Sequence, residues 1–342
     1  MLKDAKEPYI SIVMPIYNVG KYVRECLTSV YNQTMKNIEI IVIDDKSPDN
    51  SLEICQEFAQ THGNIKIIRN KENMGCSISR DTGIRHSRGK YIFVLDSDDM
   101  LYPNNMLEYM YNIAEAGQAD VVHSPGFFRL DGEKLYPCMH EVPWNLDIKQ
   151  PFFVTNNLTE RMQLWAERKI FWNHWNKLIL RKLIIDNNIQ YVNDSGNDCF
   201  FCFQCCFFAK KYIRIPEFVY IYRLNPTSLS HTRNKNNLHK SIDFHMKTLK
   251  IFNDFMKNHT FFRENINVRK KITDLVVRGV AKSFAHGIWK YNPEAIKNGY
   301  MDEMESSFAE VYGEESALFI ASMMRLCELH TRNLQNMTHW LE

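Results

Sequence analysis

The sequence has no glycine-rich motif of the kind that cradles nucleotide phosphates. No G-x-G-x-x-G follows the first apolar run, and no G-x-x-x-x-G-K-S/T occurs anywhere in the 342 residues. These motifs place phosphates on a helix N-terminus or inside a backbone loop. Dinucleotide-dependent oxidoreduction and P-loop chemistry are therefore disfavoured. A nucleotide can still bind if a metal ion and an arginine neutralise its phosphates.

Long apolar runs and a spread of disulfide-forming cysteines are also missing. No run approaches the ~20 residues that cross a bilayer, and residues 1–7 lack the apolar centre of a secretory signal. Four of the nine cysteines, Cys199, Cys202, Cys205 and Cys206, lie among phenylalanines, so we expect reduced thiols. The expected location is cytoplasmic. The uneven charge along the chain also allows peripheral contact at the inner face of the cell membrane.

The charge is nearly balanced overall but uneven along the chain. A formal net charge of +2 argues against a nucleic-acid partner. Residues 231–290 carry thirteen Lys or Arg and four Asp or Glu, whereas residues 291–342 carry three and nine. Oppositely charged helix faces that pair with each other are the favoured explanation. The alternative is a basic surface for an anionic lipid headgroup or a phosphate-bearing substrate.

Short apolar runs alternate with helical spacing over the first 125 residues. The runs predict strands at 9–14, 38–43, 65–68, 91–95 and 120–123, and the spacing predicts helices at 19–31, 51–59, 77–86 and 107–114. This alternation is typical of an α/β fold with a mainly parallel sheet covered by helices on both faces. Ligands bind such sheets beyond the carboxyl ends of the strands.

Three loops are predicted at that edge of the sheet, at 15–20, 44–49 and 96–100. The last contains Asp96, Asp98 and Asp99, three carboxylates within four residues. Such crowding raises the pKa of at least one acid unless a cation lies among them, and a hard divalent ion is the simplest candidate. The alternative is an acidic turn that only caps the following segment.

Four motifs, in order and spacing, resemble the inverting family 2 glycosyltransferases. They are Ser11–Asn18, Asp44–Ser47, Asn73–Gly75 with Ser79–Asp81, and Leu95–Asp99, and a sparser match continues through Trp175–Leu178 and Gly196–Asp198 to His231. The resemblance implies the Rossmann-like GT-A fold of nucleotide-sugar transferases for residues 1–232. A nucleotide-sugar-binding half at 8–125 and an acceptor half at 126–232 would compose it. Apolar spacing predicts helices for the remaining residues, 233–342.

The resemblance also assigns roles on the donor side. Asp98 and Asp99 would hold Mn²⁺ or Mg²⁺, with His231 as a further ligand; the alternative for His231 is an exposed loop histidine, because imidazole is a softer ligand. The remaining residues would bind the nucleotide sugar: Pro15 and Tyr17 at the base, Asp45 as acceptor of a hydrogen bond from the base, Arg80 at the diphosphate, and Asp96 with Ser97 at the ribose or metal shell.

On the acceptor side the resemblance implies that Asp198 is the general base. The family's Glu-Asp pair reads Asn197-Asp198 here, and helix N-capping is the alternative role of Asp198. Asp81 replaces the more usual Asn, and its charge would weaken donor binding or recruit the cation. Trp172 and Trp175 would stack on an acceptor sugar or pack beneath the site.

Two further segments have alternative interpretations. The cysteines of the helix predicted at 199–209 could bind iron–sulfur or zinc, but the interleaved phenylalanines favour a buried core helix. The helices of 233–342 could pack on the transferase domain, form a homodimer, or lie on a membrane that holds a lipid-linked glycan acceptor.

The expected function is metal-dependent, inverting transfer of a sugar from a nucleoside-diphosphate sugar to an acceptor hydroxyl. UDP-hexose or UDP-N-acetylhexosamine is the expected donor, and a bacterial surface glycan such as a capsule or lipopolysaccharide the expected acceptor. Two alternatives stay open. One is a nucleotide- or glycan-binding scaffold without turnover, motivated by Asn197 and Asp81. The other is a transferase with a different nucleotide-activated donor.

Overall fold

The computed structural model describes residues 7–139, 149–192, 197–225 and 238–291. The chain divides into two compact units, residues 1–225 and 226–342. The domain boundary expected between 232 and 233 lies outside the described residues.

The first unit alternates strands and helices, as the sequence predicts. Its first half comprises β1 (Ile10–Ile16), α1 (Val23–Tyr31), β2 (Ile38–Asp44), α2 (Ser51–Thr61), β3 (Ile65–Arg69), α3 (Cys76–His86), β4 (Tyr91–Val94), β5 (Met100–Leu101), α4 (Met106–Gly117) and β6 (Val121–His123). Its second half comprises β7 (Gly126–Asp131), β8 (Lys134–Met139), β9 (Phe152–Phe153), α5 (Leu158–Ala166), β10 (Lys177–Leu180), α6 (Arg181–Asp186), α7 (Asn197–Phe208), β11 (Tyr212–Arg214) and β12 (Tyr220–Arg223).

The strands form two sheets. The larger has the order β3-β2-β1-β4-β10-β6-β11-β9, and the smaller has the order β5-β12-β7-β8. Strands β3, β2, β1 and β4 are parallel to one another, whereas β10 is antiparallel to both β4 and β6. The mainly parallel central sheet expected from the sequence is confirmed. The antiparallel β10 brings the segment before residue 177 alongside the segment after β4.

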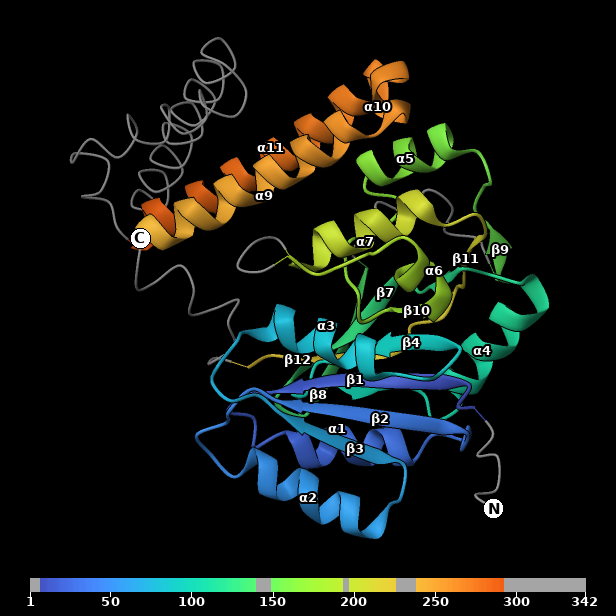
Figure 1. Cartoon of the computed structure of the whole chain (residues 1–342), viewed down its shortest axis with the longest axis vertical. Coiled ribbons are helices and arrows are strands. Elements are labelled where there is room, and N and C mark those ends of the chain that lie inside the picture. Colours follow the sequence, from blue (N-terminus) through green and yellow to red (C-terminus); the bar gives the residue numbers. More distant parts are fainter. Residues whose placement is uncertain (1–6, 140–148, 193–196, 226–237, 292–342) are drawn as a thin grey trace. The chain divides into compact units, whose positions relative to one another are not determined.

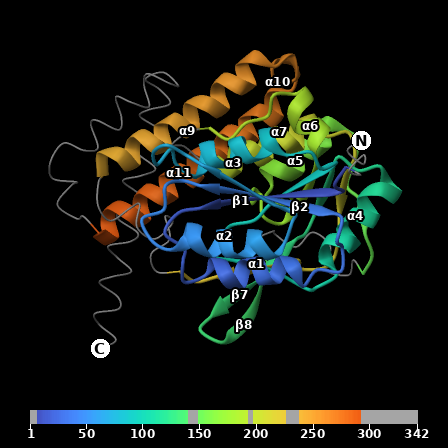
Figure 2. The ribbon, with the colours of Figure 1, turned by 60° about the horizontal axis from the view of Figure 1, so that its bottom comes forward.

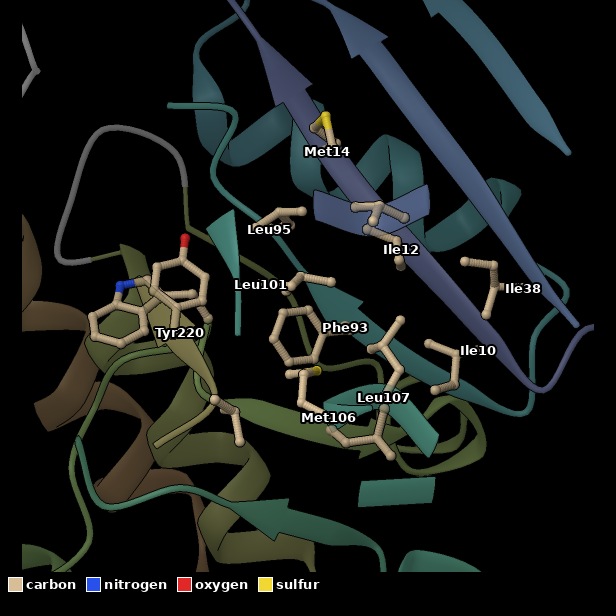
Figure 3. Close-up of a cluster of buried hydrophobic side chains, with 14 of the residues drawn as sticks. Ile10, Ile12, Met14, Ile38, Phe93, Leu95, Leu101, Met106, Leu107 and Tyr220 are labelled. Carbon is tan, nitrogen blue, oxygen red and sulfur yellow. The ribbon is translucent and has the colours of Figure 1, made fainter. Parts of the chain in front are cut away.

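The two faces of the large sheet bury alternate residues of its strands. Ile10, Ile12 and Met14 face the core that α1, α2 and α4 close (Figure 3). The intervening Val13 faces α3, where a Cβ on Gly83 would lie 2.4 Å from its Cγ1. Only glycine therefore permits this close approach of helix and sheet. Figures 1 and 2 show α3 on one side of β1 and β2 and both α1 and α2 on the other, as expected.

Helix α7 is a core helix, as the phenylalanine spacing favours. Phe201, Phe203, Cys205 and Cys206 are buried, and the ring of Phe203 packs edge-on to Trp165 at 4.9 Å. The buried guanidinium of Arg161 on α5 donates to the carbonyls of Cys206, Phe207 and Ala209, which end α7. These bonds satisfy carbonyls that have no partner within the helix. Arg161 thus fixes the end of α7 opposite Asp198.

The second unit, where described, is helical. It contains α9 (Leu238–Asn258), α10 (Thr260–Glu264) and α11 (Ile266–Tyr291), and α9 packs on α11. The buried stripe consists of Leu249, Phe252 and Met256 on α9 and Ile272 and Val276 on α11. The helix expected near 318–329 lies outside the described residues. In the part of the chain that the structure describes, no helix is long and apolar enough to cross a membrane.

Candidate active site

The loops after β1 and β4 meet at the carboxyl edge of the sheet. In the parallel register Ile16 lies opposite Asp44, so the loop after β2 ends at the same level. The Ser97 hydroxyl donates a 2.8 Å hydrogen bond to the Pro15 carbonyl and ties two of the loops together. Tyr17 lies two residues after Pro15 and is 47% exposed, a large fraction for so large a ring. The structure therefore brings Pro15, Tyr17 and Ser97 together, as expected.

Asp45 organises the loop that leads into α3. Its buried carboxylate accepts hydrogen bonds of 2.8 Å from the amide of Asn70 and from the backbone N–H groups of Met74 and Gly75. Gly75 has φ +86°, in the left-handed region that favours glycine. Asp45 therefore holds the start of α3, and with it Arg80, against the carboxyl end of β2.

Arg80 projects from α3 into a group of carboxylates and is 7% exposed. Its Nη2 donates to Asp96 Oδ1 at 2.8 Å, and its Nη1 lies 4.0 Å from Asp198 Oδ1. The guanidinium also covers the ring of Tyr191, 5.4 Å from the ring centre. Arg80 thus joins an acid of the donor side to the predicted base, more than 90 residues away in the sequence.

His174 forms a second connection between the same two acids, and the sequence analysis missed it. The side chain is fully buried; Nε2 lies 3.4 Å from Asp96 Oδ1 and Nδ1 lies 3.6 Å from Asp198 Oδ2. Its placement follows from the antiparallel pairing of β10 with β4, in which Leu178 lies opposite Phe93. The only signal in the sequence was a histidine directly before the Trp175–Leu178 motif.

Asp96, Arg80, Asp198 and His174 therefore form a closed ring of alternating acids and nitrogen bases. Burial would raise the pKa of Asp96, but the charges of Arg80 and His174 and their hydrogen bonds outweigh it and hold this pKa well below its usual range. Burial would lower the pKa of Arg80, but Asp96 raises it well above normal. Asp96 and Arg80 thus stay charged. Asp198 is the accessible member, with 39% of its side chain exposed.

The other two acids of the loop differ from each other. Asp99 is 1% exposed and accepts hydrogen bonds of 2.8 Å from the Tyr220 hydroxyl and the Arg223 backbone N–H. Burial, followed by the charges of Asp98 and Asp96, raises its pKa well above normal. Asp98 is partly exposed and accepts from the amide of Asn225 at 3.0 Å. Burial raises its pKa too, as expected for crowded carboxylates.

Asp98 and Asp99 suit a hard divalent cation, although they do not supply a complete set of ligands. Within the described ranges, no three His, Cys, Asp or Glu side chains converge as a metal site. Mg²⁺ and related ions commonly bind one or two carboxylates together with substrate phosphates and water. Asp98 fits that mode because its carboxylate is partly exposed and supplies the oxygen atoms that hard ions prefer. His231 lies outside the described residues.

The two tryptophans occupy different environments. Trp175 is 4% exposed and stacks on Tyr220 with ring centres 4.5 Å apart, so packing beneath the site accounts for it. Trp172 is partly exposed and stacks on Phe171 at 4.4 Å, with the Arg168 guanidinium 5.2 Å from its ring. Trp172 is therefore the more exposed ring of the pair.

Asp81, the departure from the usual Asn, bonds to the backbone of the segment before α7. Its carboxylate accepts a 3.1 Å hydrogen bond from the Tyr191 backbone N–H. Burial raises its pKa to about 6, against smaller lowering effects of that bond and of Arg85 and Arg80. Asp81 thus supports the segment before α7. The other departure, Asn197, begins α7, and its side chain lies outside the described part.

The family model described as Glycosyl transferase family 2 matches residues 11–214, a range that includes Asp96, Asp198 and the residues between them but ends before β12. The chain belongs to Glycosyl transferase family 2. The family predicted from the four motifs is confirmed, and with it the glycosyltransferase class and the GT-A fold. The assignment of individual residues to donor, metal and base stays a prediction.

Two relatives of this family 2 chain differ in how much of their length they share with it. The uncharacterized glycosyltransferase EpsJ of Bacillus subtilis is 31% identical over 229 residues, which cover 65% of this chain and 63% of EpsJ. The cholesterol galactosyltransferase of Borreliella burgdorferi is 30% identical over 318 residues, which cover 91% of this chain and 86% of that protein. The match thus spans less than two thirds of the first relative and most of the second.

Two solved structures share the fold of this family 2 chain at low sequence identity. Residues 1–349 of S. aureus TarS, in complex with UDP-GlcNAc, superpose with a TM-score of 0.70 at 17% identity, over 94% of this chain and 88% of that one. The mannosyltransferase PcManGT of Pyrobaculum calidifontis, in complex with GDP-Man and Mn²⁺, gives a TM-score of 0.51 at 13% identity, with the same coverages.

Proposed function

We propose that this chain is a metal-dependent, inverting glycosyltransferase that moves a sugar from a nucleoside-diphosphate sugar to an acceptor hydroxyl. The observation that carries the proposal is the juxtaposition of Asp96 and Asp198 across Arg80 and His174. One acid follows the donor-side strand β4, and the other begins the acceptor-side helix α7. A donor held by the first would present its anomeric carbon to an acceptor held by the second.

Asp198 is the proposed general base. Transfer with inversion is a single displacement, in which the acceptor oxygen bonds to the anomeric carbon while the bond to the diphosphate breaks. The exposed carboxylate of Asp198 takes the hydroxyl proton. Asp98, Asp99 and His231 are the proposed holders of Mn²⁺ or Mg²⁺, and Asp98 is the most direct of them because Asp99 already accepts two hydrogen bonds. The ion, when bound, offsets the charge that develops on the leaving diphosphate.

The nucleotide is proposed to lie along the loops that Ser97 and Asp45 organise, with its base against the exposed ring of Tyr17 and beside Pro15. A UDP-hexose or UDP-N-acetylhexosamine is the proposed donor. The complexes of TarS with UDP-GlcNAc and of PcManGT with GDP-Man and Mn²⁺ support a nucleotide sugar and a metal on this fold. Arg80 is the proposed cation at the diphosphate, and its hydrogen bond to Asp96 places it beside the donor-side acid.

The proposed acceptor is a bacterial surface glycan or its lipid-linked precursor, reached from the cytoplasmic side of the membrane, so the chain would act in polysaccharide biosynthesis. Trp172 is the proposed stacking face for an acceptor sugar. Peripheral contact through the basic stretch 231–290 and dimerisation through the C-terminal helices stay proposals for the second unit.

Donor hydrolysis tests the function without knowledge of the acceptor. Purified chain is incubated with Mn²⁺ and a panel of UDP-glucose, UDP-galactose and UDP-N-acetylglucosamine, and released UDP is measured. We expect turnover of at least one donor, and we expect Asp198→Asn to lower it by about 100-fold or more while UDP binding stays unchanged. A wild-type chain that binds UDP yet releases none from any donor is a scaffold, and the proposal fails. Binding of UDP is followed by the rise in melting temperature.

A further inference from the structure

We propose that His174 is a positioning residue that holds the general base Asp198 in line with the donor-side acid Asp96. The inference rests on the proposed function, since it concerns the orientation of the carboxylate of the proposed base. Its foundation is geometric: one buried imidazole faces Asp96 with Nε2 at 3.4 Å and Asp198 with Nδ1 at 3.6 Å. The two ring nitrogens of histidine point in different directions, so a single side chain can contact two carboxylates.

The backbone that carries His174 is immobilised by a buried lysine. Lys177, 1% exposed, donates from Nζ to the carbonyls of Phe171 and Asn173 and to Asn176 Oδ1. The backbone N–H of Lys177 donates to the His174 carbonyl at 3.2 Å. The turn that bears the imidazole is therefore held by the hydrogen bonds of Lys177, so the protein itself sets the position of the ring.

The ring itself is held by Tyr191, which meets it edge-on with centres 5.7 Å apart. Tyr191 is in turn stacked on Phe201 of α7 at 4.1 Å. Since Asp198 lies in the first turn of the same helix, a single aromatic stack sets the distance between the imidazole and the proposed base. A general base must be positioned to within a fraction of an ångström, and this stack restricts the position of Asp198.

Arg80 makes such a support necessary. Its Nη1 lies 4.0 Å from Asp198 Oδ1, and direct pairing would turn the carboxylate toward the guanidinium and away from the acceptor. His174 faces the other oxygen, Oδ2, so the carboxylate lies between two nitrogen groups. The charged and titratable groups that face His174 are Asp96, Asp198, Arg80 and Tyr191.

The cluster leaves one ring nitrogen of His174 without a hydrogen bond. His174 Nδ1, Arg80 Nε and the Tyr191 hydroxyl are among the buried polar atoms of the described residues that have no hydrogen-bond partner. A small closure of the 3.6 Å gap would complete the bond from His174 to Asp198.

The test compares His174→Phe, which keeps a ring but removes both nitrogens, with His174→Gln, which keeps one donor. Donor hydrolysis is measured for the full chain with Mn²⁺ and the best donor of the panel, and UDP binding is measured separately. We expect kcat to fall by about 100-fold in H174F and by a smaller factor in H174Q. KM for the donor and the affinity for UDP should stay within about 2-fold of wild type.

His123→Gln is the matched control, because His123 is also fully buried but lies in β6, outside the ring of charges. We expect it to lower the melting temperature and to leave kcat for donor hydrolysis nearly unchanged. The inference is overturned if H174F keeps wild-type kcat, if UDP binding falls in parallel with kcat, or if H123Q lowers kcat as much as H174F does. If wild-type chain hydrolyses no donor, the proposed function and this inference fail together. If only D198N responds, the proposed function stands and the role of His174 does not.

Discussion

Tyr220 and Asp99, 121 positions apart, share a buried hydrogen bond of 2.8 Å from the phenol to Oδ2. The same phenol oxygen accepts from the backbone N–H of Asp96 at 3.3 Å. Strand β12 of the small sheet is thus joined by these two hydrogen bonds to the acidic loop that follows β4 of the large sheet. The consequence is a division between neighbouring acids: Asp99 is bound within the protein, whereas Asp98 is the one available to a ligand.

Removal of the two charges one at a time should separate metal binding from stability. In Asp98→Asn we expect the Mn²⁺ concentration for half-maximal donor hydrolysis to rise about 10-fold or more, with the melting temperature nearly unchanged, because a carboxylate ligand is lost from a partly exposed site. In Asp99→Asn we expect a loss of about 1–3 kcal/mol in the free energy of unfolding, because the new NH₂ group would face the donor of Tyr220 or Arg223.

Urea unfolding and Mn²⁺ titration measure these two effects. Asp131→Asn, in an exposed position of β7, is the control for loss of a carboxylate as such. An unchanged Mn²⁺ requirement in D98N would show that Asp98 is not a ligand. Removal of the metal with EDTA should abolish hydrolysis in the wild type, and addition of Mn²⁺ should restore it.

Asp81 should make the stability of the chain depend on pH. Its pKa is raised by burial to about 6 in the folded state, so between roughly pH 4 and 6 the folded state binds more protons than the unfolded state. The contribution of Asp81 to the free energy of unfolding is therefore highest below pH 4 and falls as pH rises to 6. Asn lacks this charge and can still accept the bond from the Tyr191 N–H.

We expect Asp81→Asn to be more stable than wild type at pH 7 by about 2 kcal/mol, a value reduced for the remaining solvent exposure of the group. At pH 4 the two proteins should differ little. Chemical denaturation at several pH values measures the difference. A constant difference across this range would mean that Asp81 titrates normally, and a less stable variant at pH 7 would mean that its charge is favourable.

The sequence predicted which loops meet at the strand ends because that part of the structure is local. Parallel strands end at one edge, so Pro15, Asp45 and Asp96 could be placed together from the positions of three apolar runs. Crowding within four residues likewise predicted a raised pKa among the acids of the loop.

The acceptor side was harder to predict because it depends on long-range pairing. His174 reaches Asp96 only because β10 enters the sheet antiparallel, between two strands that no local pattern connects to it. The contacts of Arg80 with Asp198 and of Tyr220 with Asp99 join segments more than 100 residues apart. Periodicity describes which face of an element is apolar, but it does not say which distant polar group that element meets.

Trp172 and Trp175 illustrate the same limit, because the sequence left their roles open and burial separates them. Trp175→Ala should lower the free energy of unfolding by about 3–5 kcal/mol, since it removes a buried ring stacked on Tyr220 and edge-on to Phe127. Trp172→Ala should cost about 1 kcal/mol or less, because that ring is partly exposed. If Trp172 stacks on the acceptor, W172A should leave donor hydrolysis unchanged and raise KM for a glycan acceptor. Phe at position 172 should restore most of the affinity, because it keeps an aromatic face. Equal KM values for acceptor in W172A and wild type would remove Trp172 from the acceptor site and leave it a packing role with Phe171 and Arg168.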